Sequence, residues 1–120
     1  MSPNSIQCPR CNRRIGVKQH RYSNHSITEA SGVLCRMSLQ RIPARGVSAE
    51  AYETRAAIVA DLAWQVQDGD PILCWDYLTS LPGDELQRLL MVALAGIPTD
   101  RKVDDIYAWV RQLPSAKAAV

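Results

Sequence analysis

The strongest constraint on this chain is a cluster of metal-binding residue types near its amino terminus. Three of its four cysteines and both of its histidines lie within the first 35 residues. Cys8 and Cys11 are separated by two residues, a spacing at which a tight turn points two thiolates at one metal ion, and Pro9 helps to form that turn. The cluster predicts a module built around a metal, because a segment this small and polar has too little core to fold alone.

A metal ion bound by Cys8 and Cys11 needs two more protein ligands to complete a tetrahedral site. His20 and His25 are separated by four residues, which lies within the range seen for zinc-binding histidine pairs. We therefore expect Zn²⁺ at a site made of Cys8, Cys11, His20 and His25, with Cys35 as the substitute for one histidine. Four protein ligands leave no open position for water, so the expected ion is structural rather than catalytic.

Residues 8–16, with the sequence CPRCNRRIG, resemble the knuckle of zinc-finger and zinc-ribbon modules. The resemblance covers residues 8–25 and implies a structural zinc ion. The second half departs from the ribbon pattern, because a ribbon has a second Cys-x-x-Cys pair where this chain has His20, His25 and the single Cys35.

Two other interpretations of the cysteines remain open. A thioredoxin-type redox pair has the same Cys-x-x-Cys spacing, but that motif opens a helix after a buried strand, and no apolar strand precedes Cys8. A basic arm without any metal is the other alternative. The paired spacing and the lack of a signal-peptide core in residues 1–10 favour a reducing cytoplasm over disulfides. Cys74, between Leu73 and Trp75, is expected to be a buried apolar side chain.

Charge is divided unevenly along the 120 residues, whose net charge is +2. Residues 1–45 carry eight Lys or Arg side chains and one acid, a net charge of +7. Residues 46–120 carry six basic and eleven acidic side chains, a net charge of −5. The stretch Pro43 to Gly46 indicates a linker between them. A basic block beside an acidic one is typical either of a nucleic-acid-binding arm or of two halves that dock on each other.

The acidic half has the pattern of short amphipathic helices. Its apolar side chains recur at steps of three and four, and capping residues, proline or glycine stand at the expected boundaries. Asp70 and Pro71 are the expected cap and first residue of the second helix, and Thr99 or Asp100 is the expected cap of the last helix. The expected helices cover about residues 48–67, 70–81, 84–95 and 99–114. Short connections imply antiparallel packing.

We therefore expect a mainly α protein in three parts. Residues 1–45 form a basic zinc-finger-like module, residues 46–114 an acidic four-helix bundle, and residues 115–120 a flexible tail. A further helix is predicted over residues 27–42, starting at a Thr28 cap, with an apolar face and a line of arginines opposite. Such a helix fits either an acidic bundle or a groove of DNA.

The sequence carries no enzyme pattern. It has no glycine-rich phosphate loop, no Gly-x-Ser-x-Gly elbow and no His-Glu-x-x-His motif, so we expect no catalysis. No run reaches the roughly 18 apolar residues of a membrane span, so we expect no membrane partner.

Two function hypotheses follow from the basic module. Arginine binds phosphate through paired charge-assisted hydrogen bonds. The first hypothesis is therefore a small cytoplasmic regulator of bacterial or phage type whose finger contacts DNA or RNA. In this hypothesis the helical half forms a homodimer or contacts another protein. The expected nucleic-acid contacts are Arg10, Arg13, Arg14, Lys18, Arg21 and Arg36. The rival is a phage protein that inhibits by protein–protein interaction, for instance an anti-CRISPR or another host-takeover factor that blocks a host complex.

Overall fold

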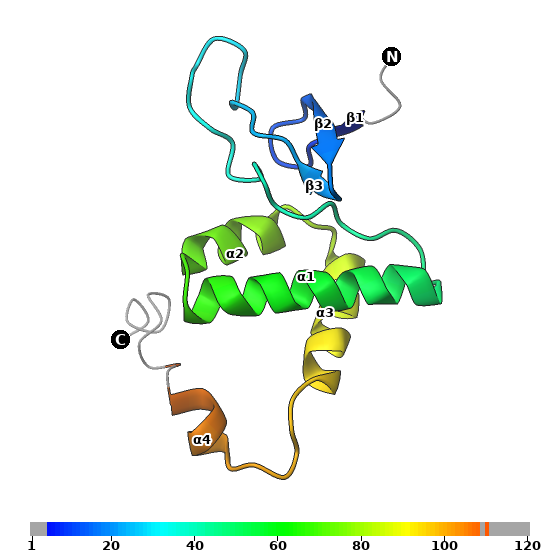
Figure 1. The fold of residues 1–120 in the computed structure, drawn as a ribbon, viewed down its shortest axis with the longest axis vertical. Helices are drawn as coiled ribbons and strands as arrows, with labels where there is room; N and C mark the ends of the chain where they lie inside the picture. The colour runs from blue at the N-terminus through cyan, green and yellow to red at the C-terminus, as the bar shows by residue number, and fades with distance from the viewer. Residues whose placement is uncertain (1–4, 109, 111–120) are drawn as a thin grey trace.

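The computed structural model describes residues 5–108 and 110, in which a small three-stranded sheet precedes the helices (Figure 1). The strands are β1 (Ser5–Gln7), β2 (Arg14–Lys18) and β3 (Arg21–Tyr22). The helices are α1 (Ala49–Gln67), α2 (Pro71–Thr79), α3 (Gly83–Ala95) and α4 (Val103–Tyr107). No helix in these residues is long and apolar enough to cross a bilayer. The chain is thus partly helical, with its sheet confined to the basic half.

The sheet is an antiparallel meander with the strand order β1-β2-β3. Ile6 pairs with Ile15, so the loop between β1 and β2 holds the Cys-x-x-Cys pair. A two-residue turn at Gln19 and His20 joins β2 to β3, and both residues have positive φ angles, of 55° and 66°. A turn with positive φ at both positions matches the twist of a hairpin.

The helix expected over residues 27–42 is wrong. The segment forms turns and isolated bridges instead, including Ser26 with Leu34 and Arg21 with Arg41. Gly32 and Leu39 have φ angles of 68° and 66°, and neither left-handed residue continues a right-handed helix. Of the apolar residues whose spacing suggested a helix, Met37 is buried, whereas Val33 and Leu34 are exposed, so these residues form no common buried face.

Local signals place the starts of α1 and α2 as expected. The Ser48 hydroxyl accepts a hydrogen bond from the Ala51 N–H at 3.1 Å, and Asp70 accepts one from the Ile72 N–H at 3.0 Å. The last helix begins at Val103, after Lys102 rather than after Thr99 or Asp100, so that expected cap is wrong.

Helix α1 packs against α2 and α3, whereas α4 is set off from them (Figure 1). The shared core contains Ile58, Leu62, Tyr77, Leu81 and Leu89. No residue of α4 is buried. Within the described residues, three helices therefore pack together, in place of the four-helix bundle that the sequence suggested. The expected helix end at Pro114 and the expected flexible tail, residues 115–120, lie outside them.

A buried ion pair joins α1 to α3. Arg55 has 0% exposure and binds both carboxylate oxygens of Glu85 at 2.8 Å. It also donates to the Gly46 carbonyl at 2.6 Å, and its guanidinium lies 4.5 Å from the centre of the Tyr52 ring. The linker and the two helices are thus held by one arginine that sequence reasoning did not single out.

The basic module rests directly on the helices. Tyr77 on α2 donates its hydroxyl to the Arg41 carbonyl at 3.0 Å. Gln40, which is buried, donates to the Leu73 carbonyl at 3.2 Å and accepts from Gln65 on α1 at 2.8 Å. These contacts orient the module relative to α1 and α2.

Candidate metal centre

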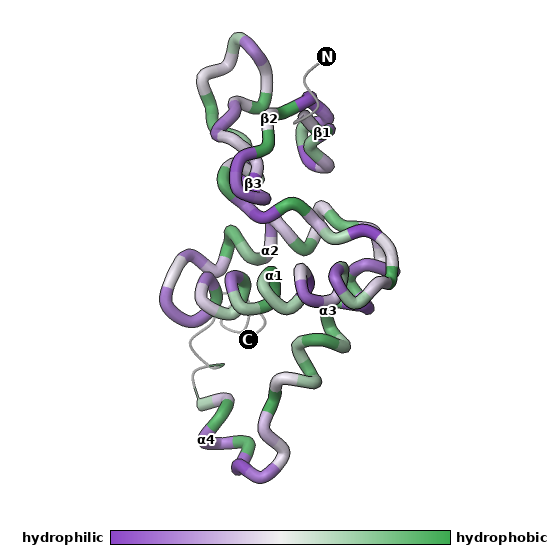
Figure 2. The backbone as a smooth tube through the Cα atoms, turned by 45° about the vertical axis from the view of Figure 1, so that its right-hand side comes forward, coloured by the Kyte–Doolittle hydropathy of each residue, from purple (hydrophilic) through white to green (hydrophobic). Residues whose placement is uncertain are grey.

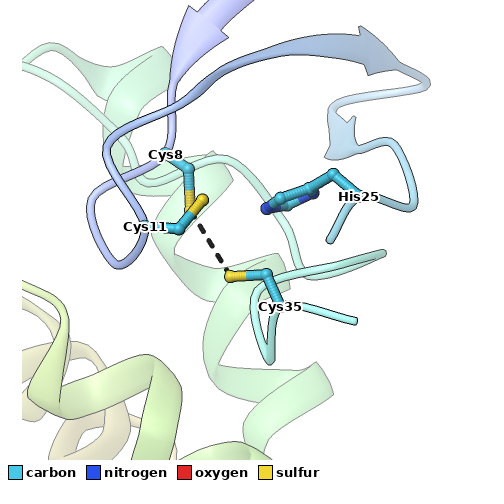
Figure 3. A group of neighbouring side chains, drawn as sticks. All are labelled: Cys8, Cys11, His25 and Cys35. Atoms are coloured by element: carbon cyan, nitrogen blue, oxygen red, sulfur yellow. Dashed lines mark hydrogen bonds between the residues drawn. The ribbon is translucent and has the colours of Figure 1, made fainter. Parts of the chain in front are cut away.

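Four side chains from three separate segments of residues 8–35 converge beside the sheet: Cys8, Cys11, His25 and Cys35 (Figure 3). Their ligand atoms all lie within 4.8 Å of one another. The Cys8 and Cys35 sulfurs are 3.9 Å apart. This is far beyond a disulfide bond of about 2.05 Å, and it matches the separation of about 3.8 Å between two sulfurs bound tetrahedrally at about 2.3 Å from one zinc ion. The group has the dimensions of a metal site.

The loop after β1 positions the first two thiols. The Cys8 N–H donates to the Arg13 carbonyl at 2.8 Å, and the Asn12 N–H donates to the Cys8 carbonyl at 2.9 Å. Asn12 has a φ of 65°, a conformation that asparagine tolerates better than most residues. The chain therefore reverses direction within a few residues, and both thiols lie on its inner side (Figure 3).

The other two side chains of the group, His25 and Cys35, lie at the two ends of a long loop, residues 26–34. The Cys35 N–H donates to the His25 carbonyl at 2.8 Å. The Ser38 hydroxyl lies 3.1 Å from both the N–H and the carbonyl of His25, accepting from the first and donating to the second. This hydrogen bonding holds His25 and Cys35 beside each other across a separation of ten residues.

The His25 ring is arranged as a ligand. Its Nδ1 lies 2.7 Å from the Ser23 carbonyl oxygen, to which Nδ1–H donates. Nε2 is buried and has no hydrogen-bond partner, and the ring points toward the sulfurs (Figure 3). Metal-bound histidines have this arrangement, with one ring nitrogen donating to a carbonyl and the other free to bind the ion. A metal ion would satisfy the nitrogen that the protein leaves unpaired.

The Cys35 thiol is neutral unless a cation joins it. Burial raises the pKa of the Cys35 thiol to about 11, and the neighbouring Cys8 thiol adds to the rise. A divalent cation at the centre would favour the thiolates instead, so binding would release protons. Three thiolates and a neutral imidazole around a divalent ion carry a net charge of −1.

The structure brings Cys8, Cys11 and His25 together as expected, and it adds Cys35 where the sequence favoured His20. His20 lies in the β2–β3 turn, exposed and outside the group. A signal was available in the sequence, since the β-branched Ile15 and Val17 alternate with Arg14, Gly16 and Lys18 up to the turn, as in a hairpin strand.

Two of the expected nucleic-acid contacts, Arg10 and Arg36, bind acidic side chains of the helical half. Arg10 lies 3.5 Å from Asp76, and Arg36 lies 2.7 Å from Asp76 and 3.3 Å from Asp70. Each arginine is the immediate neighbour of a candidate metal ligand, Cys11 or Cys35. The metal group is thereby linked to α2 through Asp76.

Arg21 makes a similar contact, at 2.8 Å from Asp61 on α1, and Arg41 joins the same carboxylate at 3.0 Å. Arg13 donates to the Ser26 carbonyl at 2.7 Å, and Arg14 to the Ser5 carbonyl at 2.9 Å. Lys18 is exposed on β2. Four arginines of the module therefore form ion pairs with aspartates of the helical half.

Fold and site together define a partly helical protein whose amino-terminal module brings three thiols and one imidazole to a single point. A model of a family of unknown function, DUF7368, matches residues 4–117, and the chain belongs to that family. No curated protein and no solved structure shows a significant match to it.

Proposed function

We propose that Cys8, Cys11, His25 and Cys35 hold a structural Zn²⁺ ion. The group consists of soft thiolates and one imidazole, ligands that suit zinc and not magnesium or calcium. Four protein ligands fill a tetrahedral shell, which leaves no place for a reacting water. The ion's role in this proposal is to fold the module and to hold the base of the loop at residues 26–34.

The proposed function of the chain is to bind another protein through that loop. The observation that carries this proposal is the exposure of apolar side chains on a loop whose two ends are metal ligands. Ile27, Val33 and Leu34 are 44%, 58% and 59% exposed. Recognition residues are commonly found on loops positioned by a rigid scaffold, and clustered apolar exposure is typical of protein-binding surfaces. We call these three side chains the apolar tip.

Nucleic-acid binding is the second candidate, with fewer side chains to support it. Arg10, Arg21 and Arg36 are engaged with aspartates. Arg14 and Lys18 remain on one face of β2, since side chains four apart on a strand share a face. Each neutralised phosphate contributes a slope of about −0.9 in log K against log salt, so contacts by these two side chains imply a slope of about −2. That is weak, non-specific binding.

A regulator and an inhibitor of a host complex, such as an anti-CRISPR, are two forms that a small binding protein of this kind can take. Both act by occupying a surface of the partner, and neither requires a reaction at the zinc ion. Both forms require contact with another protein, and the apolar tip supports such a contact. The experiment below identifies the partner.

One experiment separates the two candidates. The tagged chain is expressed in its native host and cross-linked, and its partners are quantified by mass spectrometry, alongside Val33→Asp/Leu34→Asp and Arg14→Ala/Lys18→Ala variants. We expect the tip variant to lose a specific protein partner while it retains one zinc ion per chain, and the basic variant to keep that partner.

The same three proteins are titrated against a short labelled DNA duplex at several salt concentrations. If the tip variant keeps every partner, and duplex binding is tight, steeply salt-dependent and lost in Arg14→Ala/Lys18→Ala, then protein binding is refuted and nucleic-acid binding replaces it.

A further inference from the structure

The carboxyl-terminal part of α3 is apolar on every side. Residues 89–97, with the sequence LLMVALAGI, contain no charged or polar side chain, and Figure 2 shows the hydrophobic colour along this part of the helix. Only Leu89 is buried there, whereas Leu90, Met91 and Leu94 are 57%, 66% and 53% exposed. A helix that is hydrophobic all round is normally enclosed by other protein. The contacts made within one chain leave more than one side of it uncovered.

A groove of about 730 Å³ runs beside this helix, between α1 and α2 on one wall and the segment that leads into α4 on the other. Of its nineteen lining residues, only Gln67, Arg101 and Asp105 are polar or charged. Ile106 and Tyr107 on α4 line its far wall. Helix α4, which Figure 1 shows set off from the other helices, thus forms one side of the groove.

We propose that α3 of a second copy of this chain fills this groove, in a two-fold symmetric dimer. A two-fold interface places the same patch of both copies face to face, so each charged residue near the axis meets its own like charge. Residues 89–97 carry no charge, and self-pairing along them has no such repulsion. Each copy inserts Leu90 and Leu94 toward the groove of the other, and the uncharged stretch is covered from both sides.

The size of the surface fits this occupant. Leu62, Cys74 and Leu89 are already buried within one chain, which leaves sixteen lining residues; with Met91 and Leu94 added, eighteen residues per copy can lose accessible surface. This number is close to the roughly 20 residues on each side of the smaller stable protein interfaces. Helix α4 has only five residues and no buried one, and isolated helices shorter than about 12 residues are marginal in water. A second copy in the groove would bury α4 side chains that are exposed within one chain, such as Tyr107.

The dimer surface is distinct from the apolar tip. The groove is lined by residues of α1, α2, α3 and the segment through α4, and none of Ile27, Val33 or Leu34 belongs to it. The two proposals therefore fail independently, since loss of the dimer leaves the proposed partner surface unchanged.

The experiment is light scattering coupled to size exclusion, supported by sedimentation over a wide range of concentration, on the full zinc-loaded chain. We expect a mass of twice 13.3 kDa for the wild type. Leu90→Asp/Leu94→Asp should yield the single-chain mass, with the dissociation constant raised about a hundredfold or more, because each lost leucine counts twice in a symmetric interface. Both leucines are more than half exposed, so the single chain should keep its fold, checked by circular dichroism and zinc content.

The matched control is Leu34→Asp, an equally exposed leucine on the apolar tip. It should remain a dimer. A wild type that is a single chain at the highest concentration overturns the proposal, as does a dimer that survives Leu90→Asp/Leu94→Asp. If the full chain is single and a chain shortened after Val110 is a dimer, the chain's own carboxyl terminus occupies the groove. This result also overturns the proposal.

Discussion

The amino-terminal module and the helical half reach stability by different means. Among the fully buried side chains of the module, Cys8 and Cys35 are candidate metal ligands, and few others, chiefly Tyr22 and Met37, form a core of the usual kind. The helical half instead buries aliphatic side chains between α1, α2 and α3, around the Arg55–Glu85 pair. With the proposed zinc ion, the module depends on a metal, whereas the helices depend on packing.

The difference also explains the charge asymmetry of the chain. The module carries the arginines and the helices carry the aspartates, and three aspartates, Asp61, Asp70 and Asp76, receive arginines from the module. Opposite charges on the two regions thus serve first to join them. Four changes test this comparison, in order of decreasing expected effect.

Loss of the metal should have the largest effect. Replacing His25 by Ala removes the ligand whose Nε2 is otherwise unpaired, and the module should unfold while most of the helical signal in circular dichroism remains. Structural zinc contributes roughly 10 to 16 kcal/mol of apparent binding free energy in zinc-finger peptides. The measurement is zinc affinity by competition with a chelator, together with the dispersion of the module's amide resonances.

His20→Ala is the matched control for His25→Ala, since His20 is exposed at a turn and outside the group. It should bind zinc as the wild type does. Equal losses of affinity in the two variants would contradict the assignment of ligands, and so would an unchanged spectrum of the metal-free chain.

Breaking the buried ion pair should have the next largest effect. Arg55→Met removes both close hydrogen bonds to the buried Glu85 carboxylate and leaves it only the more distant Arg88, at 3.7 Å, which costs about 3 kcal/mol of unfolding free energy. Urea unfolding followed by circular dichroism measures it. Arg55→Met/Glu85→Leu should recover most of the loss, because it removes both charges. Asp84→Asn, at the exposed carboxylate that pairs with Arg88, leaves Glu85 untouched; it is the control and should have a much smaller effect.

The contact between module and helices should be weaker. Asp76→Asn removes the carboxylate charge that Arg10 and Arg36 share, and because both arginines are partly exposed we expect a loss of about 1 to 2 kcal/mol. The loss should diminish in high salt. Asp70→Asn, at a half-exposed carboxylate, should have less effect. A larger loss in Asp70→Asn than in Asp76→Asn would show that the module is seated differently on α2.

The smallest effect concerns a surface carboxylate at the start of α3. The hydrogen bond from Arg88 lowers the pKa of Asp84 below its usual value. A lowered carboxyl pKa contributes stability above the ordinary pKa, and this contribution is lost as the pH falls through the lowered value. In Arg88→Ala the Asp84 pKa should rise toward its ordinary value, as followed by carbon-detected NMR titration. An unchanged pKa would assign the shift to the helix terminus alone.

Local features of the fold could be predicted because their interactions span only a few residues. The caps at Ser48 and Asp70 each bind a backbone N–H two or three residues away. The Cys8–Cys11 pair likewise depends on a turn within one short loop. The helix expected over residues 27–42 was wrong because its apolar spacing is compatible with both a helical face and an irregular chain that buries Cys35 and Met37.

Long-range pairings had no such signal. Arg55 and Glu85 are thirty residues apart, and Arg10 and Asp76 sixty-six. Neither composition nor periodicity specifies which arginine meets which acid, since every basic residue of the module has the same formal charge. The sequence left open whether the two charged halves dock on each other, and the structure shows that they do.

By itself, then, the sequence determined the cysteine knuckle, the division into a basic and an acidic half, and the starts of α1 and α2, because each follows from composition or from neighbouring residues. Only the tertiary structure placed Cys35 instead of His20 beside Cys8, Cys11 and His25. The reason is geometric: the β2–β3 turn holds His20 at the surface, while hydrogen bonds between distant backbone groups close the loop that brings Cys35 back to His25.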